Sequence, residues 1–197
     1  GKPEHFEINV KSIERSGVSA VIIEDKKGLK KNSLLGNKIK QTQEDITTFS
    51  KKISSGKKAL TSNDLMIIAR IECLILGKGL ADSLRRADAY LNSGADGIMI
   101  HSKNKTPNEV INFARKFKRK YPKVPLVAVP TSYNKTFEKQ LINEGFNIVI
   151  YANHLLRASY PSMNQVALEI LKNKRTYEVE KKLLSINEIL KLIPGTI

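Results

Sequence analysis

The chain has 197 residues, of which none is tryptophan, one is cysteine and 6% are aromatic. The single Cys73 excludes an internal disulfide framework and a zinc site made of several cysteines. The longest apolar runs, residues 65–69 and 148–152, are far shorter than the ~20 residues that a membrane-spanning helix needs. We therefore expect a chain with no membrane segment, in the reducing cytoplasm.

Acidic residues are outnumbered as well, since 34 Lys and Arg stand against 19 Asp and Glu, which gives a net charge of +15. Such a charge raises the question of a polyanionic partner. The lysines, however, are spread along expected helix surfaces, and the sequence has no basic arm and no aromatic–basic platform of the kind that binds RNA. The distribution indicates a solvated, lysine-rich surface rather than a nucleic-acid interface, and it also fits a small anionic substrate.

Five short apolar runs are rich in β-branched residues and predict strands. Patterns typical of helices separate them, so the chain alternates strand and helix, as proteins with parallel sheets do. The runs are apolar at nearly every position, which predicts burial on both faces. They cover residues 20–23, 66–69, 97–100, 126–129 and 148–151.

Three of these runs follow a glycine in the same layout, at Gly17, Gly94 and Gly145. A glycine at this place predicts the left-handed residue that ends a preceding helix. Capping boxes predict helix starts at residues 106–109 and 185–188, the second opening a helix over about 186–192. The sequence thus predicts repeated strand–helix units with defined boundaries.

Polar or ionisable residues stand at the carboxyl end of every expected strand. This pattern is typical of the active face of a (β/α)₈ barrel. A doubly wound open sheet also collects ligands at strand ends, but no glycine-rich phosphate loop follows any of the strands. We therefore predict an α/β fold of the (β/α)₈ TIM-barrel type. The residues are Glu24, Asp25, Arg70, Glu72, His101, Ser102, Thr131, Ser132, Asn153 and His154.

Only five strand–helix units precede the C-terminal helices, and residues 3–15 have a helical pattern with no strand before it. Eight units close a barrel of this type. We therefore expect residues 1–197 to be the C-terminal portion of one barrel domain, with three strands before Gly1. On this interpretation residues 1–197 are a fragment of the intact protein.

Arg70 stands in an otherwise buried strand, where a charge must be paired or used. Its planar guanidinium suits two-point contact with a carboxylate or phosphoryl group. Glu72 lies two residues on, toward the same side of the strand, and is placed to orient Arg70. A purely structural Arg70–Glu72 pair is the alternative.

Other candidates are judged by their position. His101 ends a buried strand and is favoured over His154 as a donor to an anion or as an acid–base group. Cys73 is expected to be a small buried residue rather than a nucleophile. Glu24 is the strand-end acid best suited to a hard cation such as Mg²⁺, although one carboxylate does not make a metal site.

Residues 26–36 are rich in ammonium, amide and hydroxyl donors and contain two glycines, Gly28 and Gly36. This composition predicts a lid that closes over an anion and excludes water. An exposed basic loop is the alternative.

At five motifs the sequence resembles the phosphoenolpyruvate phosphomutases, a family of the isocitrate lyase / phosphoenolpyruvate mutase superfamily. The resemblance covers essentially the whole chain and identifies residues 26–36 with the family's gating loop. It implies a Mg²⁺-dependent isomerase that interconverts phosphoenolpyruvate and 3-phosphonopyruvate, a carbon–phosphorus bond-forming step of phosphonate biosynthesis, and a homotetramer. The motifs are IEDKKGLKKNS (23–33), ARIE (69–72), GADGIMIHS (94–102), VPTSY (129–133) and YANHLLRA (151–158).

The resemblance also implies roles for single residues. The family's Asp-x-Asp metal turn and substrate-carboxylate loop would lie before Gly1, so we expect this polypeptide to be inactive by itself and assign the implied activity to the intact protein. The acidic residue that holds Mg²⁺ largely through water corresponds to Glu24. Two gating-loop residues that close on the substrate correspond to Lys30 and Asn32, with Asn32 beside the migrating phosphoryl group and Ser33 adjoining it. The pair that binds and neutralises this group corresponds to Arg70 and His101.

The gating-loop residues also distinguish the related activities of the superfamily. The isocitrate lyase branch carries a Lys-Lys-Cys-Gly-His motif in the gating loop, which this sequence lacks, so lyase chemistry is disfavoured. Phosphonopyruvate hydrolase resembles the chain more closely, but its loop differs around the asparagine, so Asn32 favours the mutase. A non-enzymatic alternative is an anion- or RNA-binding barrel remnant, which predicts salt-sensitive binding of polyanions.

Overall fold

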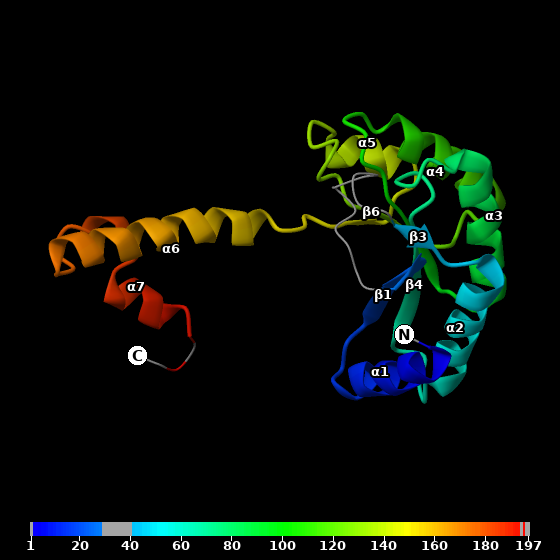
Figure 1. The fold of residues 1–197 in the computed structure, drawn as a ribbon, viewed down its shortest axis with the longest axis horizontal. Helices are drawn as coiled ribbons and strands as arrows, with labels where there is room; N and C mark the ends of the chain where they lie inside the picture. Colours follow the sequence, from blue (N-terminus) through cyan, green and yellow to red (C-terminus); the bar gives the residue numbers. More distant parts are fainter. Residues whose placement is uncertain (1, 29–40, 194, 196–197) are drawn as a thin grey trace. The chain divides into compact units, whose positions relative to one another are not determined.

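The computed structural model describes residues 2–28, 41–193 and 195. The chain forms two compact units, residues 1–151 and 152–197, and each is considered by itself. The first unit holds the sheet and the helices that cover it, and the second consists of helices (Figure 1).

The five predicted strands form one parallel sheet in the order β1-β4-β5-β6-β7. The order follows the sequence without reversal, whereas a doubly wound sheet reverses its strand order at a switch point. The sheet is therefore a segment of a barrel-type fold, as predicted. The strands are β1 (Ala20–Glu24), β4 (Met66–Ile71), β5 (Gly97–Ile100), β6 (Leu126–Ala128) and β7 (Ile148–Val149).

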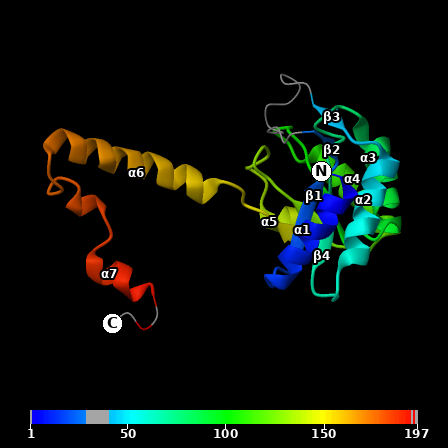
Figure 2. The ribbon, with the colours of Figure 1, turned by 60° about the horizontal axis from the view of Figure 1, so that its bottom comes forward.

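Helices alternate with these strands, and α2, α3 and α4 lie side by side along one face of the sheet (Figures 1 and 2). Each has an apolar side that needs burial, and the sheet supplies the matching surface. The helices of this unit are α1 (Pro3–Arg15), α2 (Ile46–Ala59), α3 (Gly79–Asn92), α4 (Asn108–Lys120) and α5 (Glu138–Asn143).

The core lies between the helices and one face of the strands. Side chains alternate across a strand, so every second residue points to the helices. The remaining positions, Glu24, Arg70 and Met99 among them, point to the opposite face. The core residues of the strands include Ala69, Ile71, Ile98, Ile100, Leu126 and Ala128, which pack against Phe49, Tyr90 and Phe113 from the helices.

Burial on both faces, predicted for all five strands, is found in the middle of the sheet. All residues of β5 and β6 are buried, as are most of β4. The residues of β1 and β7 are only partly buried, and Ile22 of β1 is exposed. The difference arises because β1 and β7 are the outer strands of this sheet and each has a strand neighbour on one side only.

The three glycines that precede strands have the predicted left-handed backbone, with φ of +72° at Gly17, +100° at Gly94 and +92° at Gly145. At Gly145 a Cβ would also lie 2.8 Å from the side chain of Lys118. These positions need glycine because an L side chain is strained there, and at Gly145 it would also be crowded.

The two predicted capping boxes have different outcomes. Ser185 caps α7 (Ile186–Lys191), and Glu188 completes the reciprocal box. The box at residues 106–109 is wrong, because α4 begins after Pro107 with no side-chain cap. The Glu109 carboxylate instead accepts a hydrogen bond from the Ser102 hydroxyl at 2.6 Å, so tertiary contact outweighs the local motif.

A short antiparallel pair of strands was not predicted. Lys26 and Lys27, the first residues of the expected gating loop, form β2 (Lys26–Lys27), which pairs with β3 (Thr42–Gln43). Polar two-residue strands carry no alternating apolar signal, so sequence periodicity misses them.

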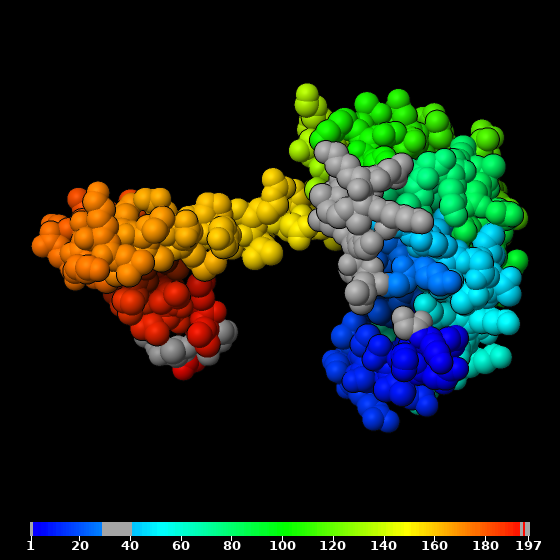
Figure 3. All heavy atoms as spheres, in the orientation of Figure 1, coloured from blue at the N-terminus to red at the C-terminus, as the bar shows by residue number. Residues whose placement is uncertain are grey.

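The second unit contains α6 (His154–Asn173), the 3₁₀ turn η2 (Glu180–Lys182) and α7. The chain turns back after α6, so that the residues that follow it, orange-red to red in Figure 3, lie beside that helix. Lys182 forms an ion pair with Glu169 of α6. Many large apolar side chains of this unit are exposed, including Leu155, Tyr160, Met163, Leu171, Ile186 and Leu192. None of the helices, as far as the structure describes them, is both long and apolar enough to cross a membrane.

Candidate active site

Three of the predicted site residues meet at the carboxyl ends of β1, β4 and β5. Glu24 of β1 pairs in register with Arg70 of β4, and Arg70 with Met99 of β5. His101 lies two residues after Met99 and therefore points to the same face. The Arg70 Nε lies 3.7 Å from a Glu24 carboxylate oxygen, and Nη2 lies 2.8 Å from the His101 Nδ1.

Glu72 contacts both Arg70 and His101. Its carboxylate is fully buried and accepts a hydrogen bond from the Arg70 Nε at 2.6 Å. The other carboxylate oxygen lies 3.0 Å from the Lys26 Nζ, and the first lies 3.0 Å from the His101 Nδ1. A buried carboxylate needs such partners because it has lost its hydration. The contact confirms the predicted pairing of Arg70 with Glu72.

The charges of this cluster cancel. Glu24 and Glu72 carry two negative charges, and Lys26 and Arg70 carry two positive ones. The side chains of Arg70 and Glu24 are 18% and 17% exposed, whereas Lys26 and Glu72 are 5% and 0% exposed. Arg70 and Glu24 are therefore the charged groups of the cluster that retain access from outside, while Lys26 and Glu72 support them.

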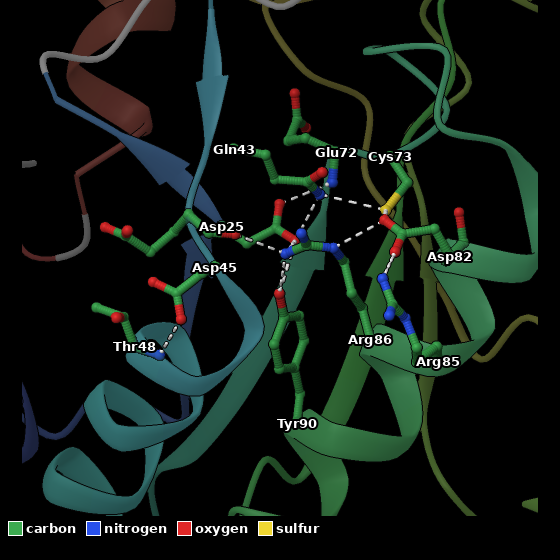
Figure 4. Close-up of polar contacts among 12 residues, drawn as sticks. Asp25, Gln43, Asp45, Thr48, Glu72, Cys73, Asp82, Arg85, Arg86 and Tyr90 are labelled. Atoms are coloured by element: carbon green, nitrogen blue, oxygen red, sulfur yellow. Dashed lines mark hydrogen bonds and ion pairs between the residues drawn. The ribbon is translucent and has the colours of Figure 1, made fainter.

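Behind this cluster, on the helix side of the sheet, Asp25 forms a buried polar network (Figure 4). Its carboxylate accepts hydrogen bonds from Gln43 Nε2 and Tyr90 Oη, both at 2.8 Å, and from the backbone N–H of Glu72 at 3.0 Å. Arg86 Nη1 lies 3.2 Å away. Burial raises the pKa of Asp25, and these donors work against that rise. The network ties the ends of β1 and β4 to α3.

Cys73 belongs to the same network and is not a nucleophile. The thiol is fully buried and donates a hydrogen bond to Asp82 at 3.0 Å. Burial, together with the Asp82 contact, raises the pKa of Cys73 to about 12. A nucleophilic cysteine needs a thiolate near neutral pH, so the expectation of a small buried residue is confirmed.

Some predicted site residues lie outside these contacts. Lys30, Asn32 and Ser33 fall in residues 29–40, outside the described residues, so their predicted roles stay predictions. His154 is the exposed first residue of α6, in the second unit.

The structure offers only a partial metal site. Within residues 2–28, 41–193 and 195, no group of three or more His, Cys, Asp or Glu side chains is placed to hold a metal ion. Glu24 fits as one oxygen ligand of a largely hydrated cation, because its carboxylate is partly exposed at the strand end. The remaining ligands would have to come from elsewhere.

A cavity of about 230 Å³ lies beside Glu24, between α1, β1 and α2. Its lining includes Phe6, Phe49 and Lys52 but neither Arg70 nor His101. It therefore adjoins the strand-end cluster at Glu24 and Lys26, on the side away from Arg70 and His101.

Sequence reasoning missed the roles of Asp25 and Lys26. Asp25 follows Glu24 in the chain and so points to the opposite face, among the helices. The signal that could have found its partners is the spacing of Asp82, Arg86 and Tyr90, which places three polar side chains on one face of α3. Lys26 gave no signal, because its buried ion pair with Glu72 joins residues far apart in the sequence.

Comparison with known proteins agrees with this geometry. The sequence profile of the phosphoenolpyruvate phosphomutase family matches residues 1–171. The chain is 36% identical to a phosphoenolpyruvate phosphomutase of Tetrahymena pyriformis, over 93% of the chain and 60% of the relative. It is 38% identical to a phosphonopyruvate hydrolase of Variovorax sp. (strain Pal2), over 93% of the chain and 62% of the relative. The chain thus spans about three fifths of these relatives.

Solved structures give the same result. The crystal structure of a phosphoenolpyruvate phosphomutase from Streptomyces platensis subsp. rosaceus superposes with a TM-score of 0.88 at 35% identity, covering 98% of this chain and 65% of that one. A phosphonopyruvate hydrolase in complex with oxalate and Mg²⁺ superposes with a TM-score of 0.82 at 35% identity, covering 98% and 64%. On its fold, its strand-end residues and these matches, the chain belongs to the phosphoenolpyruvate phosphomutase family of the isocitrate lyase / phosphoenolpyruvate mutase superfamily.

Proposed function

We propose that the intact protein is a Mg²⁺-dependent phosphomutase that interconverts phosphoenolpyruvate and 3-phosphonopyruvate. Toward phosphonopyruvate, the bond from phosphorus to the enol oxygen breaks and a bond from phosphorus to carbon 3 forms. The reverse reaction breaks the carbon–phosphorus bond and returns the phosphoryl group to the oxygen. No atom is gained or lost, so the enzyme is an isomerase.

The observation that carries this proposal is the contact between Arg70 and His101, at 2.8 Å, at neighbouring strand ends. Phosphoryl transfer passes through a loose transition state that needs positioning and charge neutralisation more than a strong nucleophile. Arg70 offers planar N–H donors, and His101 offers a ring nitrogen. Together they bind and orient the migrating phosphoryl group.

The charge balance of the site supports an additional cation. Glu24, Glu72, Lys26 and Arg70 sum to zero, so these four residues alone do not attract a substrate that carries several negative charges. When bound, Mg²⁺ supplies positive charge at the substrate oxygens. Glu24 is the residue that would hold it, largely through water, and a hydrolase relative binds Mg²⁺ with oxalate.

The segment that carries Lys30, Asn32 and Ser33 supplies the rest of the proposed site. On the family resemblance, Lys30 closes on the substrate and Asn32 lies beside the phosphoryl group, with Ser33 adjoining it. Water excluded by this closure cannot protonate the enolate, which preserves it for attack on phosphorus.

A second candidate function is phosphonopyruvate hydrolysis, in which water takes the phosphoryl group and pyruvate and phosphate are released. The observation that favours it is the 38% identity to the Variovorax hydrolase, slightly above the 36% to the Tetrahymena mutase. We place it second because Asn32 resembles the mutase loop.

Phosphorus NMR of the full-length protein with phosphonopyruvate separates these activities, with a sample containing EDTA in place of Mg²⁺ as the control. We expect phosphoenolpyruvate to appear with little free phosphate, and only with Mg²⁺ present. Free phosphate with pyruvate would instead establish the hydrolase. No turnover, combined with salt-sensitive binding of RNA, would replace the enzyme with a polyanion-binding protein.

We also propose that the protein is a homo-oligomer. The exposed apolar side chains of the second unit support this, because an apolar surface of this kind typically marks an interaction site. Light scattering coupled to size-exclusion chromatography measures the mass directly. A monomer over a wide concentration range would contradict the proposal.

A further inference from the structure

The His101 Nδ1 lies between two groups with opposite demands. The Arg70 Nη2 lies 2.8 Å away and can only donate a hydrogen bond. The Glu72 carboxylate oxygen lies 3.0 Å away and, when ionised, can only accept one. A proton on Nδ1 would satisfy Glu72 and oppose Arg70, whereas a bare Nδ1 would satisfy Arg70 and oppose Glu72. The neutral ring therefore has to favour one partner.

Glu72 is satisfied without His101. One of its oxygens accepts from the Arg70 Nε at 2.6 Å, and the other pairs with the Lys26 Nζ at 3.0 Å. Each oxygen of the carboxylate thus already has a charged donor, so Glu72 does not depend on a proton at His101 Nδ1.

Arg70, in contrast, is directed at Nδ1 by its own geometry. The N–H groups on Nε and Nη2 lie on one edge of the planar guanidinium and point the same way. Because Nε donates to Glu72, Nη2 is aimed at the atom beside that oxygen, which is the His101 Nδ1. The same edge thus holds two acceptors, a carboxylate oxygen and a bare ring nitrogen.

We propose that the Arg70 guanidinium, which Glu72 anchors through Nε, holds the neutral His101 ring with its proton on Nε2. Arg70 accepts no proton and so leaves Nδ1 as the bare nitrogen. The consequence rests on the proposed function: a neutral ring presents an N–H donor at Nε2, which suits a phosphoryl oxygen. The opposite tautomer would present a lone pair and repel it.

The tautomer is measured directly by solid-state NMR of the full-length protein labelled with ¹⁵N at histidine, without substrate, at a pH where the ring is neutral. The His101 signals are identified by their loss in His101→Asn. We expect a bare, pyridine-type nitrogen at Nδ1 and a protonated one at Nε2. A protonated Nδ1 in the unaltered protein would overturn the proposal without any variant of Arg70 or Glu72.

The variant Arg70→Met tests the cause. It removes the donor to Nδ1, so Glu72 becomes the partner of that nitrogen and we expect the proton to move to Nδ1. Arg119→Met, an exposed arginine on α4, is the matched control and should leave the tautomer unchanged. Retention of the Nε2 proton in folded Arg70→Met would contradict the role given to the guanidinium.

If circular dichroism shows that Arg70→Met does not fold, Glu72→Gln takes its place. The amide removes the charge that competes for a proton on Nδ1, so the Nε2 tautomer must persist, and a change to Nδ1 would overturn the proposal. The NMR spectrum reports the His101 tautomer without substrate, so this result does not depend on whether the enzyme turns over. The expected tautomer without mutase or hydrolase activity would reject the proposed function alone. An active enzyme with the proton on Nδ1 would reject the role of the Arg70 guanidinium alone.

Discussion

The hydroxyl of Tyr90 provides a sharp test of the buried network around Asp25. It donates to the Asp25 carboxylate at 2.8 Å and accepts from the Arg86 Nη1 at 2.8 Å. The ring itself is fully buried and packs against Phe49, with the centroids 4.7 Å apart. Tyr90→Phe keeps the ring and its packing and removes only the oxygen, so the variant isolates the two hydrogen bonds.

The expected cost follows from the charge of the partner. A hydrogen bond to a charged group contributes about 1.5–3 kcal/mol, more than one between neutral groups. Asp25 keeps Gln43 and the Glu72 N–H as donors, and Arg86 keeps the Glu44 carbonyl, so neither charge is left without a partner. We therefore expect Tyr90→Phe to lower the free energy of unfolding by about 2 kcal/mol.

Equilibrium unfolding in urea, followed by circular dichroism at one protein concentration, measures this change. Thr106→Val is the control, because it removes a hydroxyl from an exposed side chain of the first unit, and it should change stability by less than about 0.5 kcal/mol. Combining Tyr90→Phe with Asp25→Asn should cost less than the sum of the single changes, since both remove the same bond. A cost no larger than the control, or full additivity, would refute the reasoning.

Three further predictions concern the site and its surroundings. Arg70→Lys keeps the positive charge but loses the planar edge of the guanidinium, so kcat/KM for phosphonopyruvate should fall about 10- to 100-fold, the equivalent of one charge-assisted hydrogen bond. The control Arg119→Lys should leave kcat/KM unchanged, and normal turnover of Arg70→Lys would show that Arg70 is not part of the site. Because burial holds the Cys73 pKa at about 12, iodoacetamide should not modify the folded protein at mildly alkaline pH and should do so after unfolding in urea; modification of the native thiol would contradict its burial. Hydrogen bonds from the Thr61 and Ser62 backbone lower the pKa of Glu14 from 4.5 to about 2, so its ionised form stabilises the fold above pH 4.5, and this contribution is lost as pH falls toward 2. The stability difference between the unaltered protein and Glu14→Gln should shrink over that range, and a difference independent of pH would count against the assignment.

Much of the fold could be predicted because its signals are local. Buried parallel strands need apolar residues along their whole length, and the glycines before them need a left-handed backbone, so both features appear as short patterns in the chain. The helix at Pro3–Arg15 and the strand at Gly97–Ile100 were predicted with the bounds that the structure has. The antiparallel pair of β2 and β3 has no such pattern, because polar strands of two residues each carry no alternation of apolar side chains.

Some residues of the candidate site also have a local signal in the sequence, and others have none. Arg70 and His101 were identifiable because a charged residue in a buried strand, or at its end, conflicts with its surroundings and must have a partner or a task. The role of Asp25 was not identifiable, because its neighbour Glu24 carries the same charge. The two side chains point to opposite faces of the sheet only because side chains alternate along a strand.

The sequence by itself thus determined that the chain alternates strands and helices, that polar residues gather at one end of the strands, and which family it resembles. Only the tertiary structure decided that Lys26 and Glu72 form a buried ion pair, that Tyr90 and Arg86 bind Asp25, and that Arg70 and Glu72 both face the His101 Nδ1. The physical reason is that these contacts join residues on different strands and helices. Their formation depends on the three-dimensional packing of the sheet, which no local pattern contains.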